Sequence, residues 1–127
     1  MKTYILLDGG ATKPIISKKA AKELGVTTVK KNADINTVLE TAYGPREFTP
    51  DIAVGNLQGD LILHLPETMV LDFTTTENDK PPRNEDIKEH EYMKGVKFEE
   101  LEHREISVIL SAEYAWTCFV FTCLKCI

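Results

Sequence analysis

Short apolar runs, each ended by glycine, proline or polar residues, form the dominant pattern along this chain. The first run, Tyr4–Leu7, is unbroken and stops at Asp8, which the pair Gly9–Gly10 follows directly. A short unbroken apolar run bounded by a flexible turn is typical of a buried strand. We therefore expect a buried strand over Tyr4–Leu7 and a sharp turn immediately after Asp8.

Capping signals then enclose one predicted helix. Pro14–Ile16 resumes an extended segment, and Ser17 has the short polar side chain that accepts a hydrogen bond at a helix N-cap. Gly25 offers the left-handed conformation in which many helices end. The sequence thus predicts a second extended segment that leads directly into a helix over Lys18–Leu24.

Between residues 26 and 73 the pattern changes to short β-prone stretches separated by turn signals. We expect strands over Ile35–Leu39, Glu47–Val54, Asp60–Leu65 and Met69–Phe73. Turns are expected at Tyr43–Pro45, at Gly55–Asn56 and Gln58–Gly59, and at Pro66. This alternation of strands and turns predicts antiparallel β organisation.

The last third of the chain combines a polar segment with two apolar ones. Residues 74–91 are mostly polar and charged, which predicts a mobile charged surface loop, and one or two helical turns are expected over Phe98–His103. Ile106–Leu110 predicts a buried strand. We expect a turn or short helix over Ser111–Trp116 and a final apolar strand over Cys118–Ile127.

Composition and charge limit the classes of function. The chain has 127 residues, of which 43% are hydrophobic and 28% charged, and these values fit one globular domain with one core. Its 20 acidic and 15 basic residues give a net charge of -5. Because binding to nucleic acid relies on a basic surface that neutralises phosphates, we expect no nucleic acid partner.

Neither end of the chain predicts targeting to a membrane. Asp8 interrupts the first apolar run after four residues, so we expect no secretion signal. The longest apolar segment, 106–127, contains Glu113 and Lys125. A strand, a turn and a second strand therefore explain this segment better than a membrane span does.

The cysteines favour a reducing, intracellular compartment. Cys118, Cys123 and Cys126 are the three cysteines of the chain, and all lie within its last ten residues, unlike the dispersed pairs of secreted domains. A CxxC pair invites a redox or zinc interpretation, but redox motifs open a helix beside a βαβ unit and structural zinc needs four ligands. We expect buried, inert cysteines and neither a metal nor a cofactor.

Other familiar motifs are missing from the sequence. His64, His90 and His103 have neither the spacing of a metal site nor the partners of a nucleophile. Gly9–Gly10 is not part of a phosphate-binding loop. Asp8 remains, as an acid at the end of an apolar strand and before a turn whose backbone N–H groups are free to donate. From its context alone it is either the polar residue of an Asx turn or a catalytic acid.

A resemblance bears on this choice. The segment LLDGGATKPIIS over Leu6–Ser17, with the following helix and Leu24–Val26, resembles the active-site segment of retroviral-type aspartic proteases, the retropepsins. The later segment ISVILSAEYAW over Ile106–Trp116 is similar to the late segment in the aspartic peptidase domain of BEL/Pao-type retrotransposon polyproteins. The order and separation of both segments agree with this family.

The resemblance implies a mainly β fold, a retropepsin-like acid protease half-barrel with one or two short helices that forms a single domain over 1–127. It further implies a homodimer without cofactors in which a pair of Asp8 residues activates water to hydrolyse a polypeptide substrate. A hairpin covering the substrate would lie within Glu47–Leu65. The active-site loop would comprise Gly9, Gly10 and Ala11, and its support Ile109, Leu110 and Ser111.

Three departures from the family pattern leave alternatives open. Gly9 stands where the family has serine or threonine, and Ser111 stands where it has glycine. Only seven residues precede Asp8, so the chain looks truncated or remodelled at its start relative to the family. An active peptidase, a catalytically degenerate dimerisation or protein-interaction module, and an unrelated β-rich binding domain are the three hypotheses.

Overall fold

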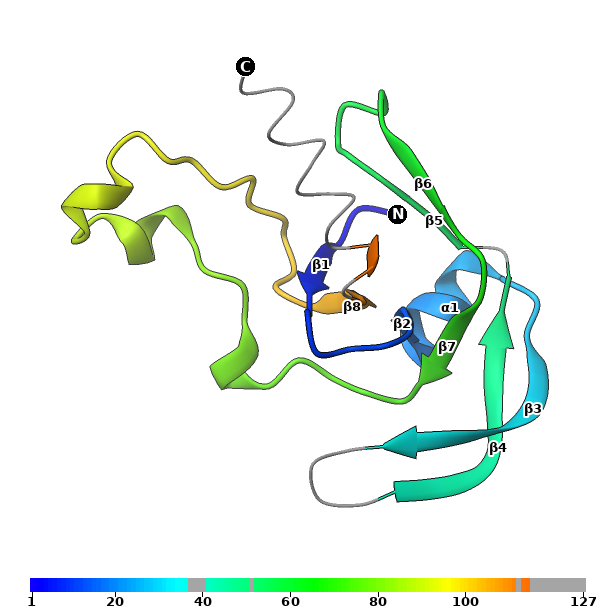
Figure 1. The fold of residues 1–127 in the computed structure, drawn as a ribbon. Helices are drawn as coiled ribbons and strands as arrows, with labels where there is room; N and C mark the ends of the chain where they lie inside the picture. Colours follow the sequence, from blue (N-terminus) through cyan, green and yellow to red (C-terminus); the bar gives the residue numbers. More distant parts are fainter. Residues whose placement is uncertain (37–40, 51, 112, 115–127) are drawn as a thin grey trace.

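Strands make up most of the regular structure in the computed structural model, which describes residues 1–36, 41–50, 52–111 and 113–114 (Figure 1). In chain order the elements are β1 Tyr4–Leu7, β2 Ile15–Ser17, α1 Lys18–Leu24, β3 Val29–Asn36, β4 Thr41–Thr49, β5 Ile52–Gly55, β6 Ile62–Leu65, β7 Thr68–Leu71 and β8 Ile106–Leu110. Three 3-10 turns, η1 Glu77–Asp79, η2 Asn84–Ile87 and η3 Glu91–Met93, lie between β7 and β8. None of the helices in these ranges is long and apolar enough to cross a membrane.

Six strands form one mixed sheet in the order β1-β8-β2-β7-β4-β3. β1 is parallel to β8 and β2 is parallel to β7, whereas the other neighbouring pairs are antiparallel. β5 and β6 form a separate antiparallel hairpin. The expectation of a mainly β chain with a short helix is confirmed, but the organisation is mixed rather than antiparallel, and the strands within the described ranges do not close into a barrel.

The short helix forms where the capping signals predicted it. The Ser17 side-chain oxygen accepts a hydrogen bond of 3.1 Å from the backbone N–H of Ala20. Gly25 ends the helix in the left-handed conformation, with φ of 65°. Ala20 and Ala21 are buried, so α1 covers the sheet with its small side chains.

The core lies where the sheet, the helix and the β5–β6 hairpin meet. Its buried apolar residues are Ile16, Ala20, Ala21, Ile52, Leu65, Val70, Val108 and Leu110. Leu110 is only 1% exposed. The end of β8 is therefore anchored by one of the most buried side chains of the described structure.

The first strand has the predicted bounds, but the prediction that it is buried is wrong. Leu6 is 43% exposed and Leu7 is 52% exposed. The reason is that β1 lies at the edge of the sheet, with β8 as its only neighbour in the sheet order. An unbroken apolar run did not distinguish this edge strand from a central one.

The hairpin of β3 and β4 differs most from expectation. Val29–Asn36 forms a strand that starts well before the predicted Ile35–Leu39, of which residues 37–39 lie outside the described residues. Tyr43–Pro45 is not a turn but part of β4, where Pro45 pairs with Asn32. β4 meets β7 only over Glu47–Thr49, so at Pro45 it has one neighbour, and a missing amide hydrogen is tolerated there.

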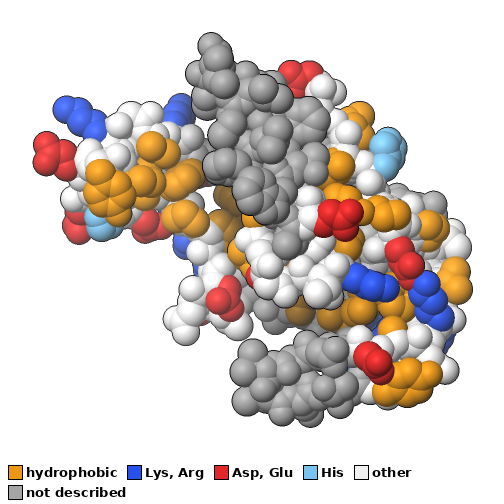
Figure 2. Space-filling view, viewed as in Figure 1, with side chains coloured by type: hydrophobic (Ala, Val, Ile, Leu, Met, Phe, Trp, Pro, Cys, Tyr) orange, Lys and Arg blue, Asp and Glu red, His pale blue; other side chains and the backbone are white. Residues whose placement is uncertain are grey.

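Residues 72–105 form a long connection from β7 to β8 that contains no strand (Figure 1). The Asn84 side chain donates to the Phe98 carbonyl at 2.9 Å and accepts from the Phe98 N–H at 2.6 Å. The Tyr4 hydroxyl accepts from the Leu101 N–H at 2.9 Å. These contacts hold Phe98–His103 in a non-helical conformation, so the predicted helical turns there are wrong. Figure 2 shows apolar and charged side chains together on the lobe at the left that η2 and η3 form.

Candidate functional site

Asp8 lies immediately after β1, at the point where the end of β8 fixes its backbone. Its N–H donates to the Leu110 carbonyl at 3.0 Å, which continues the parallel pairing of Leu7 with Leu110. Its own carbonyl accepts from the Ala11 N–H at 3.2 Å. The residue is exposed within the single chain. The cause is its place at the end of an edge strand.

The two glycines after Asp8 have different roles in the turn. The Gly10 N–H donates to one Asp8 carboxylate oxygen at 2.9 Å. A Cβ added at Gly10 would lie 3.3 Å from that oxygen, closer than an ordinary contact, whereas one at Gly9 would meet nothing within 4 Å. Gly10 therefore allows the backbone to approach the carboxylate, while position 9 has room for a side chain. The hydrogen bond from Gly10 thus both forms an Asx turn and orients the Asp8 carboxylate.

The end of β8 lies beside the Asp8 turn. Ile109 pairs with Leu6 on one side and with Ile15 on the other. Ser111 is 1% exposed, and its hydroxyl oxygen has no hydrogen-bond partner in the part of the chain that the structure describes. The structure thus brings Ile109, Leu110 and Ser111 next to the turn, although about a hundred residues separate them in sequence.

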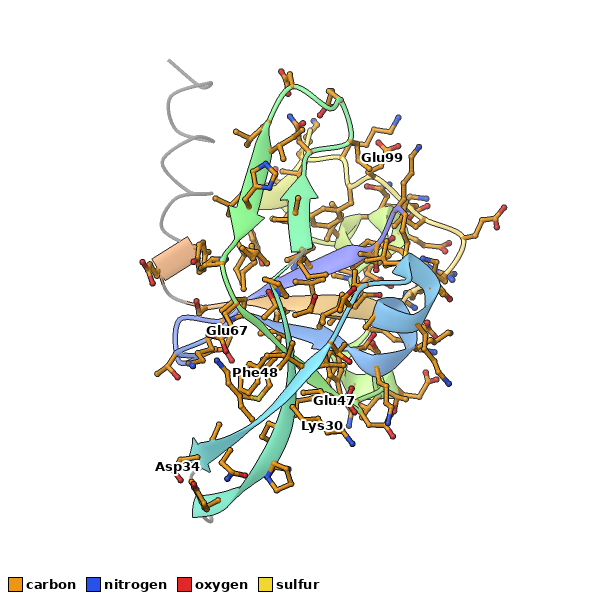
Figure 3. All side chains as sticks on the ribbon, turned by 90° about the vertical axis from the view of Figure 1, so that its right-hand side faces the viewer. Lys30, Asp34, Glu47, Phe48, Glu67 and Glu99 are labelled. Carbon is orange, nitrogen blue, oxygen red and sulfur yellow. The ribbon has the colours of Figure 1, made fainter. Side chains whose placement is uncertain are left out.

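A second group of side chains lies where the segment that links β1 to β2 meets the β3–β4 hairpin. The Lys13 ammonium lies 5.4 Å from the centroid of the Phe48 ring, and the Lys31 ammonium lies 4.8 Å from it. Phe48, at the end of β4, is 2% exposed. The β3–β4 hairpin and the 8–14 segment therefore meet at this ring. Figures 1 and 3 both show the hairpin extending toward the side of the molecule on which that segment lies.

The charges around this ring are coupled. Lys31 forms an ion pair with Glu67, which lies between β6 and β7. The hydrogen bond from Lys31 holds the pKa of the Glu67 carboxyl below its ordinary value, and the charge of Lys13 contributes in the same direction against the opposing effect of burial. The ion pair with Lys31 therefore favours the ionised form of Glu67.

Sequence reasoning missed Lys13, Lys31, Phe48 and Glu67 as a group, because they come from separate segments. The region expected to cover a substrate, Glu47–Leu65, contains the end of β4 and the β5–β6 hairpin. The buried Ile52 and Leu65 tie that second hairpin to the core. The preceding hairpin, β3–β4, also projects from the molecule, at the opposite end from the β5–β6 hairpin (Figure 1).

Other candidate chemistry does not assemble in the described residues. His64, His90 and His103 are exposed and lie on different segments. No group of three or more metal-ligating side chains occurs within the described ranges. Cys118, Cys123 and Cys126 lie outside them, as does the predicted strand Cys118–Ile127.

Comparisons of the chain with protein-family models, with curated proteins and with solved structures gave no match. The function of the site is therefore argued from its residues. Its central feature is an acid that the ends of two parallel strands, β1 and β8, position beside a glycine turn.

Proposed function

We propose that this chain is an aspartic endopeptidase of the retroviral or retrotransposon type, with a retropepsin-like fold. The observation that carries the proposal is the hydrogen bond of 3.0 Å from the Asp8 N–H to the Leu110 carbonyl. It joins the two sequence segments on which the resemblance rests, and it does so at the candidate catalytic acid. The parallel register of Leu7 with Leu110 supports the same arrangement.

In the proposed mechanism two copies of the chain meet so that their Asp8 carboxyls share one water molecule. Two carboxyls in close contact do not both ionise, so one acts as a base and the other keeps its proton. The ionised Asp8 takes a proton from the water as it attacks the peptide carbonyl carbon, and the protonated Asp8 donates to the carbonyl oxygen. Transfer of a proton to the leaving nitrogen completes the cleavage. The exposure of Asp8 in the single chain leaves it accessible to a second copy.

The β3–β4 hairpin is the element that we propose covers the bound polypeptide. It projects beside the 8–14 segment, and the contact of Lys13 with the Phe48 ring ties its base to that segment. This assignment moves the substrate cover from the predicted Glu47–Leu65 region to Val29–Thr49. The hairpin is open to solvent on its outer strand, since β3 is the last strand in the sheet order.

A catalytically degenerate interaction module is the second candidate, and the surroundings of Asp8 favour it on one point. Ser111 places a hydroxyl without a hydrogen-bond partner among the described residues beneath the active-site turn. A buried polar group without a partner costs about 1 to 3 kcal/mol, and a cost of this size at Ser111 would weaken the support of the turn. Gly9, in addition, provides no hydroxyl to join the turns of two copies.

A cleavage assay distinguishes the two candidates. The purified chain and its Asp8→Asn variant are incubated with an unfolded protein at several values between about pH 4 and 7, the range in which a coupled acid pair is active. Asp72→Asn is the matched control, because Asp72 is also exposed and follows a strand. The peptidase proposal requires fragments from the wild type and from Asp72→Asn but none from Asp8→Asn. Absence of cleavage by the wild type across this range would favour the degenerate module.

A further inference from the structure

One face of the β3–β4 hairpin gathers positive charge in an otherwise acidic chain. Lys31 and Arg46 are direct partners in the antiparallel register, so their side chains leave the hairpin on the same face. Phe48, two residues after Arg46, shares that face because side chains alternate along a strand. Lys13 approaches the same Phe48 ring from the segment after Asp8. Two cations thus lie over one ring, and a third shares its face of the hairpin, in a chain with a net charge of -5.

Among the described residues, Lys31 is the one of these three cations that has an ion-pair partner. Glu67 pairs with Lys31, whereas neither Lys13 nor Arg46 has a carboxylate at ion-pair distance among the residues that the structure describes. The Arg46 Nε is buried and donates no hydrogen bond to a described residue. The group formed by Lys13, Lys31, Arg46 and Glu67 around Phe48, here named the cationic cluster, therefore has two positive charges in excess.

The opposite face of the hairpin differs in charge. Lys30 pairs with Glu47 in the register, which places one positive and one negative side chain together there. Figure 3 shows Phe48 and Glu67 on one side of the hairpin and Lys30 with Glu47 on the other. The excess of positive charge belongs to the face toward the 8–14 segment, because Lys13 contacts Phe48 on that face.

We infer that the cationic cluster binds an acidic side chain of the polypeptide that this chain cleaves. The inference rests on the proposed function for its location, because a chain bound between Asp8 and the β3–β4 hairpin passes the cluster. The chemistry favours a carboxylate, because the Arg46 guanidinium and the Lys13 ammonium both carry a positive charge and a guanidinium has the donor geometry that matches a carboxylate.

The inference is tested by binding, in the Asp8→Asn variant, so that no cleavage interferes. The probes are a fluorescein-labelled hexaglutamate peptide and the corresponding hexaglutamine peptide, and the readout is fluorescence anisotropy. We expect hexaglutamate to bind more tightly than hexaglutamine. Raising sodium chloride from about 0.05 to 0.5 M should weaken the binding of hexaglutamate, because salt screens exposed charges. Equal binding of the two peptides would overturn the inference.

Three variants locate the binding on the molecule. Lys13→Gln and Arg46→Gln each remove one cation of the cluster, and each should weaken hexaglutamate binding about two- to fivefold, the range of an exposed ion pair. Lys30→Gln removes the same charge from the opposite face and should leave binding unchanged. Lys13 is exposed, so its variant tests the cluster even where Arg46→Gln does not fold. An equal loss in Lys30→Gln would mean that general charge attraction, not the cluster, binds the peptide.

Two further outcomes separate this inference from its premise. Tighter binding of a labelled six-residue oligothymidine than of hexaglutamate would overturn the assignment to an acidic polypeptide. If the active chain cleaves an unfolded protein but Lys13→Gln leaves hexaglutamate binding unchanged, the inference fails while the proposed function stands. If Lys13→Gln and Arg46→Gln weaken hexaglutamate binding but the wild-type chain cleaves nothing, the carboxylate site stands and the peptidase proposal fails.

Discussion

Gly9→Thr provides a quantitative test of the proposed dimer. A Cβ at position 9 meets no atom within 4 Å, and the backbone there does not have a positive φ, so threonine fits the turn of the single chain. In the family that the sequence resembles, a hydroxyl at this position links the active-site turns of the two copies. Each copy would contribute one such hydrogen bond to the dimer.

The expected size of the effect follows from two symmetric bonds. A hydrogen bond contributes about 0.5 to 1.5 kcal/mol net, so a pair contributes about 1 to 3 kcal/mol to dimer formation. This corresponds to a dimer dissociation constant about 5- to 150-fold lower in Gly9→Thr than in the wild type. Gly9→Ala is the matched control, because it adds the Cβ without the hydroxyl.

Sedimentation velocity at several protein concentrations measures the dissociation constants of the three proteins. The reasoning requires Gly9→Thr to associate more tightly than both Gly9→Ala and the wild type. If Gly9→Thr and Gly9→Ala have the same dissociation constant, Gly9 does not lie at a two-fold axis. That result would refute the arrangement in which two Asp8 turns face each other.

Three further predictions concern stability. Ser17→Ala removes the N-cap hydrogen bond of α1 and should lower the stability by about 1 kcal/mol, measured as a Tm lower by about 4 °C for a chain of this size. Truncation after Trp116 removes an apolar segment that we expect to pack as a strand, so amide hydrogen exchange in β8 should become faster; unchanged exchange would show a dispensable tail. The pKa of Glu67 lies below its ordinary value of 4.5 in the folded chain, so its ion pair with Lys31 stabilises the fold above that pH and loses its effect as the pH falls through the folded pKa. The Tm difference between wild type and Glu67→Gln should therefore shrink on acidification; a constant difference would argue against the pair.

Local signals made α1 predictable. Ser17 and Gly25 act within one helical turn of their own positions, so the bounds Lys18–Leu24 follow from neighbouring residues alone. The same holds for the extent of β1 and β8, whose apolar runs end at polar or small residues. Burial could not be predicted from neighbouring residues. Leu6 and Leu7 are exposed because β1 is an edge strand, and the apolar run Tyr4–Leu7 does not show its place in the strand order.

The β3–β4 hairpin and the candidate site depended on contacts between distant segments. Val29–Asn36 is largely polar, and Lys31 interrupts the alternation of apolar and polar residues, so only the end of this strand was predicted. The position of Asp8 in sequence was a sufficient signal for a candidate acid, and the resemblance indicated Leu110 as its support. The cationic cluster joins Lys13 and Arg46 from segments more than thirty residues apart, and only the register of the hairpin shows that they share a face.

The central claim, that one active site uses an Asp8 residue from each of two chains, is tested most directly by mixing. Wild-type protein is held at a constant concentration at which it is dimeric, and the Asp8→Asn variant is added while cleavage of an unfolded protein is followed. Random exchange of subunits places wild-type chains in inactive mixed dimers, so about a ninefold excess of the variant should reduce the rate to about one tenth. A rate that stays constant as Asp8→Asn is added, or cleavage by Asp8→Asn alone, would contradict the account.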